Sequence, residues 1–149
     1  MARPDHDRAG FRRPERPDRA RLRGVILLLD AHALLWWLRD EAVLDRAART
    51  SIADPANDVV VSAATIWELE IKRSLAKLEA PNDLLAVLEV EEFDCIPVLG
   101  GDAVRAAGLP MHHRDPFDRM ILAQALRLDA VIVSRDPALE AYDVAILRA

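Results

Sequence analysis

An unbroken run of five aliphatic residues at positions 25–29 ends abruptly at Asp30. Such a short, continuous apolar run is typical of a parallel β-strand that is covered on both faces. The apolar residues at positions 33–38 predict a helix that covers one of these faces. Asp30 then lies at the carboxyl end of a central strand, where open α/β sheets bind their ligands. Capping of the following helix explains an aspartate at this position equally well.

Strands and helices alternate along the rest of the chain. Apolar runs predict further strands at residues 59–61, 95–99 and 130–133, and an edge strand at 144–147. Pro97 indicates that the strand at 95–99 is also at an edge. Helical spacing and capping residues predict helices over residues 41–53, 62–78, 82–90, 102–107 and 115–128, and a short helix over 137–142. Alternation of this kind implies right-handed crossovers. We therefore predict a three-layer α/β/α fold with a central, mainly parallel sheet of four or five strands.

Charge divides the chain into two parts. Residues 1–24 carry a net charge of +4, whereas residues 25–149 carry −9. The first part combines Arg, Pro and Asp without apolar periodicity, which predicts a disordered basic leader. We interpret Val25 as a residue at or near the true start of translation, and residues 25–149 as a single domain.

The acidic body argues against a broad nucleic-acid-binding surface. It suits clustered carboxylates that need a cation or a basic partner, although solubility explains an acidic surface equally well. The single cysteine, Cys95, excludes an internal disulfide and favours the cytoplasm as the location of the protein. No segment approaches the roughly 20 apolar residues that a membrane span requires.

Four acids occupy positions that a doubly wound sheet can bring to one edge. Asp30 and Asp136 follow predicted strands, and Asp118 lies in the first turn of a largely apolar helix. Glu68 lies in the helix over 62–78, beside an apolar stripe that includes Trp67 and Leu75, at the margin between core and solvent. Each acid also has a local explanation. Helix capping accounts for Asp30 and Asp136, a favourable helix-start charge for Asp118, and an ion pair with Lys72 for Glu68.

If the four acids converge, their mutual repulsion raises some of their pKa values unless a cation neutralises them. Oxygen ligands without a nearby cysteine, and without a histidine pair at zinc spacing, favour Mg²⁺ or Mn²⁺. Such a site suits phosphodiester hydrolysis, because metal ions activate and orient an attacking water.

Other polar residues near these acids are weaker candidates. The histidines are candidate metal ligands or proton donors, although surface and hydrogen-bonding roles are more common. The arginines are candidate phosphate clamps, with ion pairs to neighbouring aspartates as the alternative. These residues are His32, His112, His113, Arg114, Arg119 and Arg135.

Four motifs follow one another along the chain. They are Leu-Leu-Leu-Asp30-Ala-His-Ala-Leu-Leu-Trp-Trp, Ser62-Ala-Ala-Thr-Ile-Trp67-Glu68, His113-Arg-Asp115-Pro-Phe-Asp118-Arg119 and Val133-Ser-Arg-Asp136-Pro. In this order and spacing they resemble the PIN-domain ribonucleases and, among them, the VapC toxins of bacterial type II toxin-antitoxin systems. The resemblance extends from about Val25 to Leu147.

The resemblance implies a PIN-like fold and a Mg²⁺-dependent endoribonuclease toxin that cuts structured RNA such as tRNA or rRNA. It also implies a homodimer and a cognate antitoxin that holds the enzyme inactive. The acidic site of the family carries over to Asp30, Glu68, Asp118 and Asp136, whereas the pattern implies for Asp115 a helix cap that also reaches the site through water. Two positions depart from the family, because Ala31 and Ser134 stand where threonine is common.

Two further interpretations concern partners and rival functions. Trp36 and Trp37 are candidates for a dimer or antitoxin interface, with core packing as the alternative. A catalytically silent protein that keeps the antitoxin interface alone is the alternative function, yet all four acids are present. A phospho-acceptor receiver domain is disfavoured, since Ala31 and His32 follow Asp30 in place of an acidic pair and no lysine follows Val133.

Overall fold

The computed structural model describes residues 24–149, so the predicted leader lies almost wholly outside the described residues. The elements, in chain order, are β1 (Ile26–Leu29), α1 (Ala31–Leu38), α2 (Arg46–Ala53), β2 (Asp58–Ser62), α3 (Ala63–Ser74), α4 (Leu84–Val90), β3 (Asp94–Ile96), α5 (Gly100–Gly108), α6 (Pro116–Leu128), β4 (Val131–Ser134), the 3-10 helix η1 (Pro137–Ala141) and β5 (Ala145–Arg148). None of the helices in this described part has the length and apolar character that a membrane crossing requires.

The five strands form one parallel sheet in the order β3-β2-β1-β4-β5. This confirms the predicted fold class, and it confirms β3 and β5 as edge strands. In the centre, Leu28 of β1 lies beside Val60 of β2 and Ile132 of β4. Because β1 has β2 on one side and β4 on the other, the carboxyl ends of β1 and β4 flank the point where the strand order reverses. Ligand sites of open α/β sheets lie at such points.

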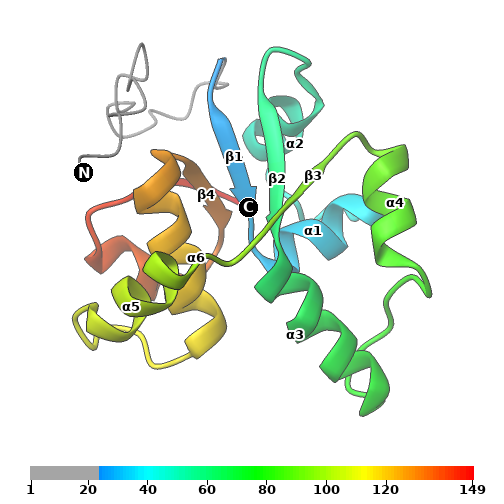
Figure 1. Ribbon diagram of the computed structural model, residues 1–149. Helices are drawn as coiled ribbons and strands as arrows, with labels where there is room; N and C mark the ends of the chain where they lie inside the picture. Colours follow the sequence, from blue (N-terminus) through cyan, green and yellow to red (C-terminus); the bar gives the residue numbers. More distant parts are fainter. Residues whose placement is uncertain (1–23) are drawn as a thin grey trace, which may run out of the picture.

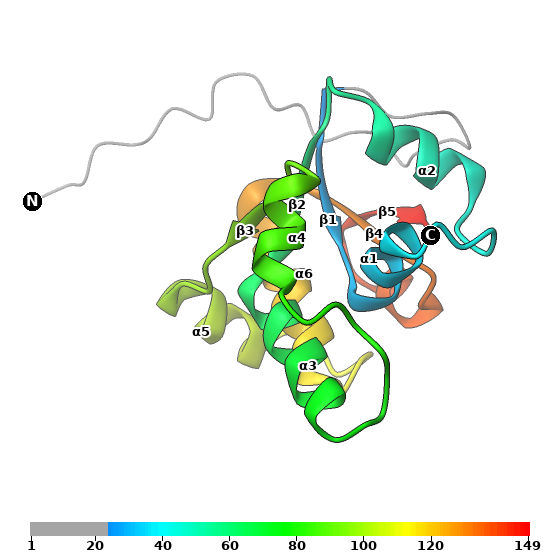
Figure 2. The same ribbon diagram turned by 90° about the vertical axis from the view of Figure 1, so that its right-hand side faces the viewer.

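Helices cover both faces of the sheet. Leu27 and Leu29 of β1 are fully buried in a core with α1, α2 and α4, whereas Leu28 is buried in a second core with α6 and η1. Figure 1 shows α5 and α6 on one side of the sheet and α1 and α4 on the other, and Figure 2 shows α2 on the same side as α1. Burial of each leucine side chain stabilises the fold by about 1.5–3 kcal/mol. The continuous apolar run of β1 is therefore explained by burial on both faces.

The orientation of α3 differs from the prediction in a way that matters for the site. We expected an apolar stripe including Trp67 and Leu75 to face the core, with Glu68 at its margin and the helix continuing to Leu78. Instead α3 ends at Ser74 and buries Ala64, Thr65, Glu68 and Leu69. Trp67 is 64% exposed and Leu75 is 58% exposed. The later turns of α3 extend beyond the sheet (Figure 1) and have little core to cover, whereas Trp67, in an earlier turn, lies outside the face that buries Glu68 and Leu69.

Candidate active site

All four predicted acids line one cavity of about 390 Å³. Asp30 follows β1, Glu68 lies in α3, Asp118 lies in the first turn of α6, and Asp136 follows β4. Four separate elements therefore supply the acids, and the expected convergence at the carboxyl edge of the sheet is what the structure shows. A cavity of this volume is in the range of small-ligand sites.

Capping and a place in the cavity prove to be compatible for two of the acids. Asp30 Oδ1 accepts a hydrogen bond of 2.8 Å from the backbone N–H of Ala33, at the start of α1. Asp136 Oδ1 accepts one of 2.9 Å from the backbone N–H of Ala138, at the start of η1. Each cap uses one carboxylate oxygen, so the second oxygen remains for another contact. Capping is therefore confirmed for both acids, and it is compatible with their place in the cavity.

Three of the four acids have raised pKa values. Burial raises the pKa of Asp30, against the opposing effect of hydrogen bonds from Ser134 and Ala33. Burial also raises the pKa of Glu68, although the ammonium group of Lys72 lies 3.3 Å from its Oε2. The predicted ion pair within α3 is thus present, but it does not compensate the burial.

The pKa of Asp118 is raised as well, and by a large amount. Burial raises its pKa to about 7, and the charge of Asp115 adds to the rise. Asp115 caps α6 through a 2.8 Å bond from the N–H of Phe117 and also lines the cavity. The carboxylates of this site are therefore short of positive charge.

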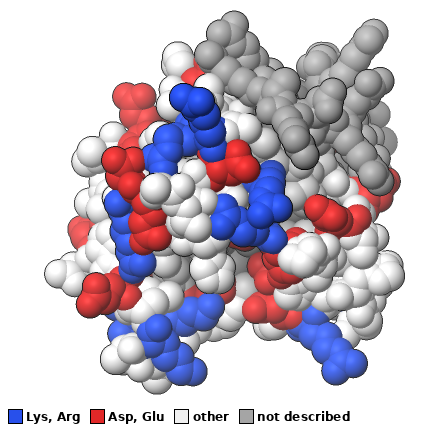
Figure 3. Space-filling model, turned by 180° about the vertical axis from the view of Figure 1, so that it is seen from behind, with Lys and Arg blue, Asp and Glu red and all other residues white. Residues whose placement is uncertain are grey.

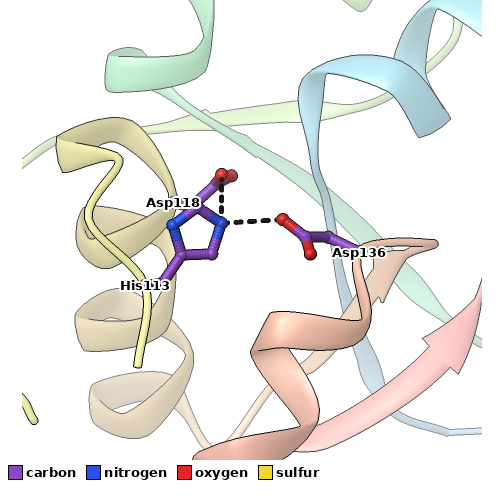
Figure 4. A group of neighbouring side chains, drawn as sticks. All are labelled: His113, Asp118 and Asp136. Atoms are coloured by element: carbon purple, nitrogen blue, oxygen red, sulfur yellow. Dashed lines mark hydrogen bonds and ion pairs between the residues drawn. The ribbon is translucent and has the colours of Figure 1, made fainter. Parts of the chain in front are cut away.

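His113 contacts two of the acids through one ring nitrogen. Its Nε2 lies 2.7 Å from Asp136 Oδ2 and 3.0 Å from Asp118 Oδ2 (Figure 4). Burial acts to raise the pKa of Asp136, but the N–H of Ala138 and the His113 ring outweigh it, and the pKa is lowered. His113 is only a weak candidate in the sequence, because no local pattern connects it with Asp136, 23 residues later.

Arg119 is neither a phosphate clamp nor an ion-pair partner of an aspartate, so both predicted roles are wrong. Its side chain is buried and donates hydrogen bonds to backbone carbonyls of the segment before α6, including those of Leu109 at 2.8 Å, Pro110 at 3.0 Å and His113 at 3.1 Å. The hydroxyl of Tyr142 also donates to the Pro110 carbonyl and accepts from the His113 N–H. Arg119 and Tyr142 therefore fix the loop that carries His113.

Arg135 lines the cavity, but its contacts lie away from the acids. Its guanidinium carbon lies 4.6 Å from the centre of the Trp36 ring, and its Nε donates to the Ala149 carbonyl at 2.9 Å. Arg114 is exposed. The His32 ring packs on Trp36, at the wall of the cavity, and the His112 ring packs on Tyr142.

The two tryptophans of α1 pack against the core. Trp36 and Trp37 are both half-buried beside the core that covers β1, and Trp37 Nε1 donates to Glu91 Oε2 at 2.9 Å. This arrangement favours the packing interpretation over an interface. Trp67 is the tryptophan with the largest exposure in the described part of the chain, and its ring makes an edge contact with Phe117.

The residues of the cavity fit a hard divalent cation. Ligand atoms of His113, Asp118 and Asp136 lie within 4.8 Å of one another. Asp30 and Glu68 add carboxylate oxygens to the same cavity, and burial raises the pKa of both, which a bound cation would offset. Oxygen-rich donor sets of this kind suit Mg²⁺ or Mn²⁺.

Away from the cavity, Figure 3 shows Lys and Arg side chains interspersed with Asp and Glu over the visible part of the back face. No broad basic field covers the described residues in this view. That face therefore does not favour the binding of an extended nucleic acid along one basic surface.

Comparison with known proteins identifies the family. The family model of the PIN domain matches residues 27–145. No curated protein matches the sequence. Among solved structures, VapBC-5, a member of the VapBC family of toxin-antitoxin systems from Mycobacterium tuberculosis, is 26% identical, with a TM-score of 0.56 over 84% of this chain and 99% of that chain.

Two more distant structures share the fold. FitAcB from Neisseria gonorrhoeae has a TM-score of 0.61 at 23% identity, over 82% of this chain and 96% of that chain. VapBC2 from Rickettsia felis, solved with a DNA fragment from its promoter, has a TM-score of 0.61 at 11% identity, over 82% of this chain and 97% of that chain. The resemblance that the four motifs carried is thereby confirmed: the chain belongs to the PIN domain family, whose members are generally nucleases.

Proposed function

We propose that the protein is a Mg²⁺-dependent endoribonuclease that acts in the cytoplasm as the toxin of a type II toxin-antitoxin system. Its substrate is structured RNA such as tRNA or rRNA, and Mn²⁺ is an alternative ion. The observation that carries the proposal is that Asp30, Glu68, Asp118 and Asp136 line one cavity. Uncompensated carboxylates in a cleft are typical of sites that take up a cation for chemistry.

Asp30 and Asp118 are proposed as the primary ligands of the cation, with Glu68 and Asp136 completing the site directly or through water. A divalent ion in such a site supplies Lewis-acid stabilisation of a phosphate and a water of lowered pKa. The acids repel an RNA phosphate until a cation neutralises them, so substrate binding and ion binding are coupled. Near neutral pH, Asp118 holds a proton for part of the time in the cation-free protein, because its pKa is about 7.

The proposed protein partner is a cognate antitoxin with a basic segment. The negative charge of residues 25–149 is complementary to such a segment, and charge complementarity favours fast and specific association. The similar VapBC and FitAB structures come from toxin-antitoxin systems or complexes. A homodimer is also proposed, supported by the exposed Trp67 and Leu75 side chains of α3, since large exposed apolar groups are common at interfaces.

The test is cleavage of total cellular RNA by the purified protein without antitoxin, in Mg²⁺ or in EDTA. We expect discrete fragments that require Mg²⁺ and that disappear with Asp118→Asn. Asp102→Asn is the matched control, because Asp102 is also buried in the same half of the chain but lies outside the cavity. If the protein cuts no RNA and still binds its antitoxin, the silent binding protein is the better interpretation.

A further inference from the structure

Both ring nitrogens of His113 are engaged, and the contacts determine which of them carries the proton. The backbone N–H of Asp115 donates to Nδ1 of His113 at 3.1 Å. Because Nδ1 accepts a hydrogen bond, it has no proton, so the proton of the neutral ring is on Nε2. Nε2 hydrogen-bonds Asp136 Oδ2 at 2.7 Å, with Asp118 Oδ2 at 3.0 Å from the same nitrogen. The ring is therefore a hydrogen-bond donor toward the acids.

The backbone of His113 is fixed as firmly as its ring. Its N–H donates to the Tyr142 hydroxyl at 2.8 Å, and its carbonyl accepts from Arg119 at 3.1 Å. Arg119 is only 7% exposed, and the side chain of His113 is 13% exposed. These bonds set the position of the imidazole before any ligand enters the cavity.

Ligation of a cation by Nε2 requires this proton to move to Nδ1. There it would face the N–H of Asp115, so that two donors would point at each other and the 3.1 Å bond would be lost. The contacts of His113 use Oδ2 of Asp118 and of Asp136, and leave Asp118 Oδ1 for another ligand. Second-sphere donors of this kind orient ligating carboxylates, and their loss typically weakens metal binding about 10- to 100-fold.

We propose that His113 is a positioning residue of the metal site, which holds Asp118 and Asp136 together as an Nε2–H donor and does not itself coordinate the ion. This inference rests on the proposed function and adds a second-sphere residue to the same site. Without this donor, the two carboxylates repel each other and have to be ordered by the ion itself.

Two neutral variants separate the two contacts of the ring. In His113→Asn, the side-chain oxygen can accept from the Asp115 N–H, since Asn bonds the backbone two residues on, but it is too short to reach the acids. In His113→Gln, an amide N–H is available near the position of Nε2. We expect calorimetric Mg²⁺ affinity to fall about tenfold or more in His113→Asn, to recover largely in His113→Gln, and to stay unchanged in the neighbouring control His112→Asn.

A second measurement is made on the wild type, and the His113→Asn variant is needed only to assign a signal if one is seen. We expect electron spin-echo modulation of the Mn²⁺-loaded wild type to show no nitrogen of a directly bound imidazole. A directly coupled ¹⁴N signal that disappears in His113→Asn would make His113 a ligand and overturn the proposal. Unchanged or tighter Mg²⁺ binding by a folded His113→Asn protein would also overturn it, as would a wild type that binds neither ion.

These readouts do not depend on RNA cleavage. A protein that binds Mg²⁺ through the His113-dependent site but cuts no RNA contradicts the proposed nuclease and leaves the role of His113 supported. Conversely, a protein that cuts RNA with Mg²⁺ at the same metal affinity in wild type and His113→Asn supports the nuclease and rejects the positioning role.

Discussion

Asp102 and Asp118 are both carboxylates in helical first turns, yet their environments act in opposite directions. Asp102 is only 2% exposed, but its oxygens lie 2.7 and 3.1 Å from two guanidinium nitrogens of Arg127. Burial acts to raise its pKa, but Arg127 and the N–H of Leu99 outweigh burial, and the pKa is lowered. Asp118 is less buried than Asp102, with a side chain 22% exposed, yet its pKa is raised to about 7.

The difference is the presence of a fixed cation. Arg127 of α6 neutralises Asp102 of α5, and this ion pair joins the two helices. Near the cavity, the buried guanidinium of Arg119 is bonded to backbone carbonyls, and that of Arg135 lies over Trp36. Both acids are buried to some degree, and the fixed cation beside Asp102 therefore distinguishes this structural ion pair from the candidate site.

The largest expected effect is on RNA cleavage by Asp30→Asn. Asparagine can still cap α1 through its oxygen, but it removes a charged ligand, so we expect the cleavage rate to fall at least about 100-fold. The melting temperature should stay the same or rise, because burial disfavours the charge that is removed. Cleavage rates and thermal melts check both points, and a cleavage rate near that of the wild type would break the assignment of Asp30 to the site.

Asp102→Asn should have the reverse profile. We expect the free energy of unfolding to fall by about 2 kcal/mol, because hydrogen bonds to a charged partner typically contribute about 1.5–3 kcal/mol. The cleavage rate per folded molecule should be unchanged. Urea denaturation measures the change in stability, and a cleavage assay under native conditions measures the activity. A loss of activity in the folded variant would show that Asp102 and Asp118 are not independent.

Mg²⁺ should stabilise the protein by a smaller amount, through the cavity acids alone. At a concentration of about ten times Kd, binding to the folded state contributes about 1.4 kcal/mol. Melting curves with and without Mg²⁺ should show this shift in the wild type and in Asp102→Asn, but not in Asp30→Asn. A shift that persists in Asp30→Asn would place the ion elsewhere.

In metal-free protein, the two acids should give pH dependences of stability that are opposite in sign. Asp118 binds its proton more tightly when folded, so stability should fall as pH rises from about 4 to about 7. Asp102 binds its proton less tightly when folded, so its contribution is lost as pH falls through its lowered pKa. Each slope should stay below the about 1.4 kcal/mol per pH unit of one whole proton. Denaturation of Asp118→Asn across this range should show a flatter pH dependence than the wild type, and equal slopes would remove Asp118 as the cause.

Local patterns were enough to predict the sheet and the four acids. The apolar run before Asp30 fixed the central strand, and the helix starts at Asp115 and Asp136 were visible as aspartate followed by proline. The phase of α3 was wrong, because periodicity assigns Trp67 to the core and takes no account of where the sheet ends.

Long-range partners were not predictable from single-sequence patterns. His113 meets Asp136 only because α6 and β4 pack on the same sheet, and Arg119 finds its partners in carbonyls, which carry no side-chain signature. The sequence places Arg119 directly after Asp118, but it does not show that the guanidinium group of Arg119 points away from the carboxylate. Such contacts depend on the loop conformation between α5 and α6.

The double use of Asp30 and Asp136 constrains how this lineage can lose its activity. Both acids cap helices, so replacement by alanine removes a cap that typically contributes about 1 kcal/mol as well as the charge. Asparagine and serine preserve the cap, whereas Glu68 and Asp118 carry no such requirement. Descendants of this sequence that drift toward inactivity should therefore accept many residues at positions 68 and 118, but mainly Asn, Ser or Thr at positions 30 and 136.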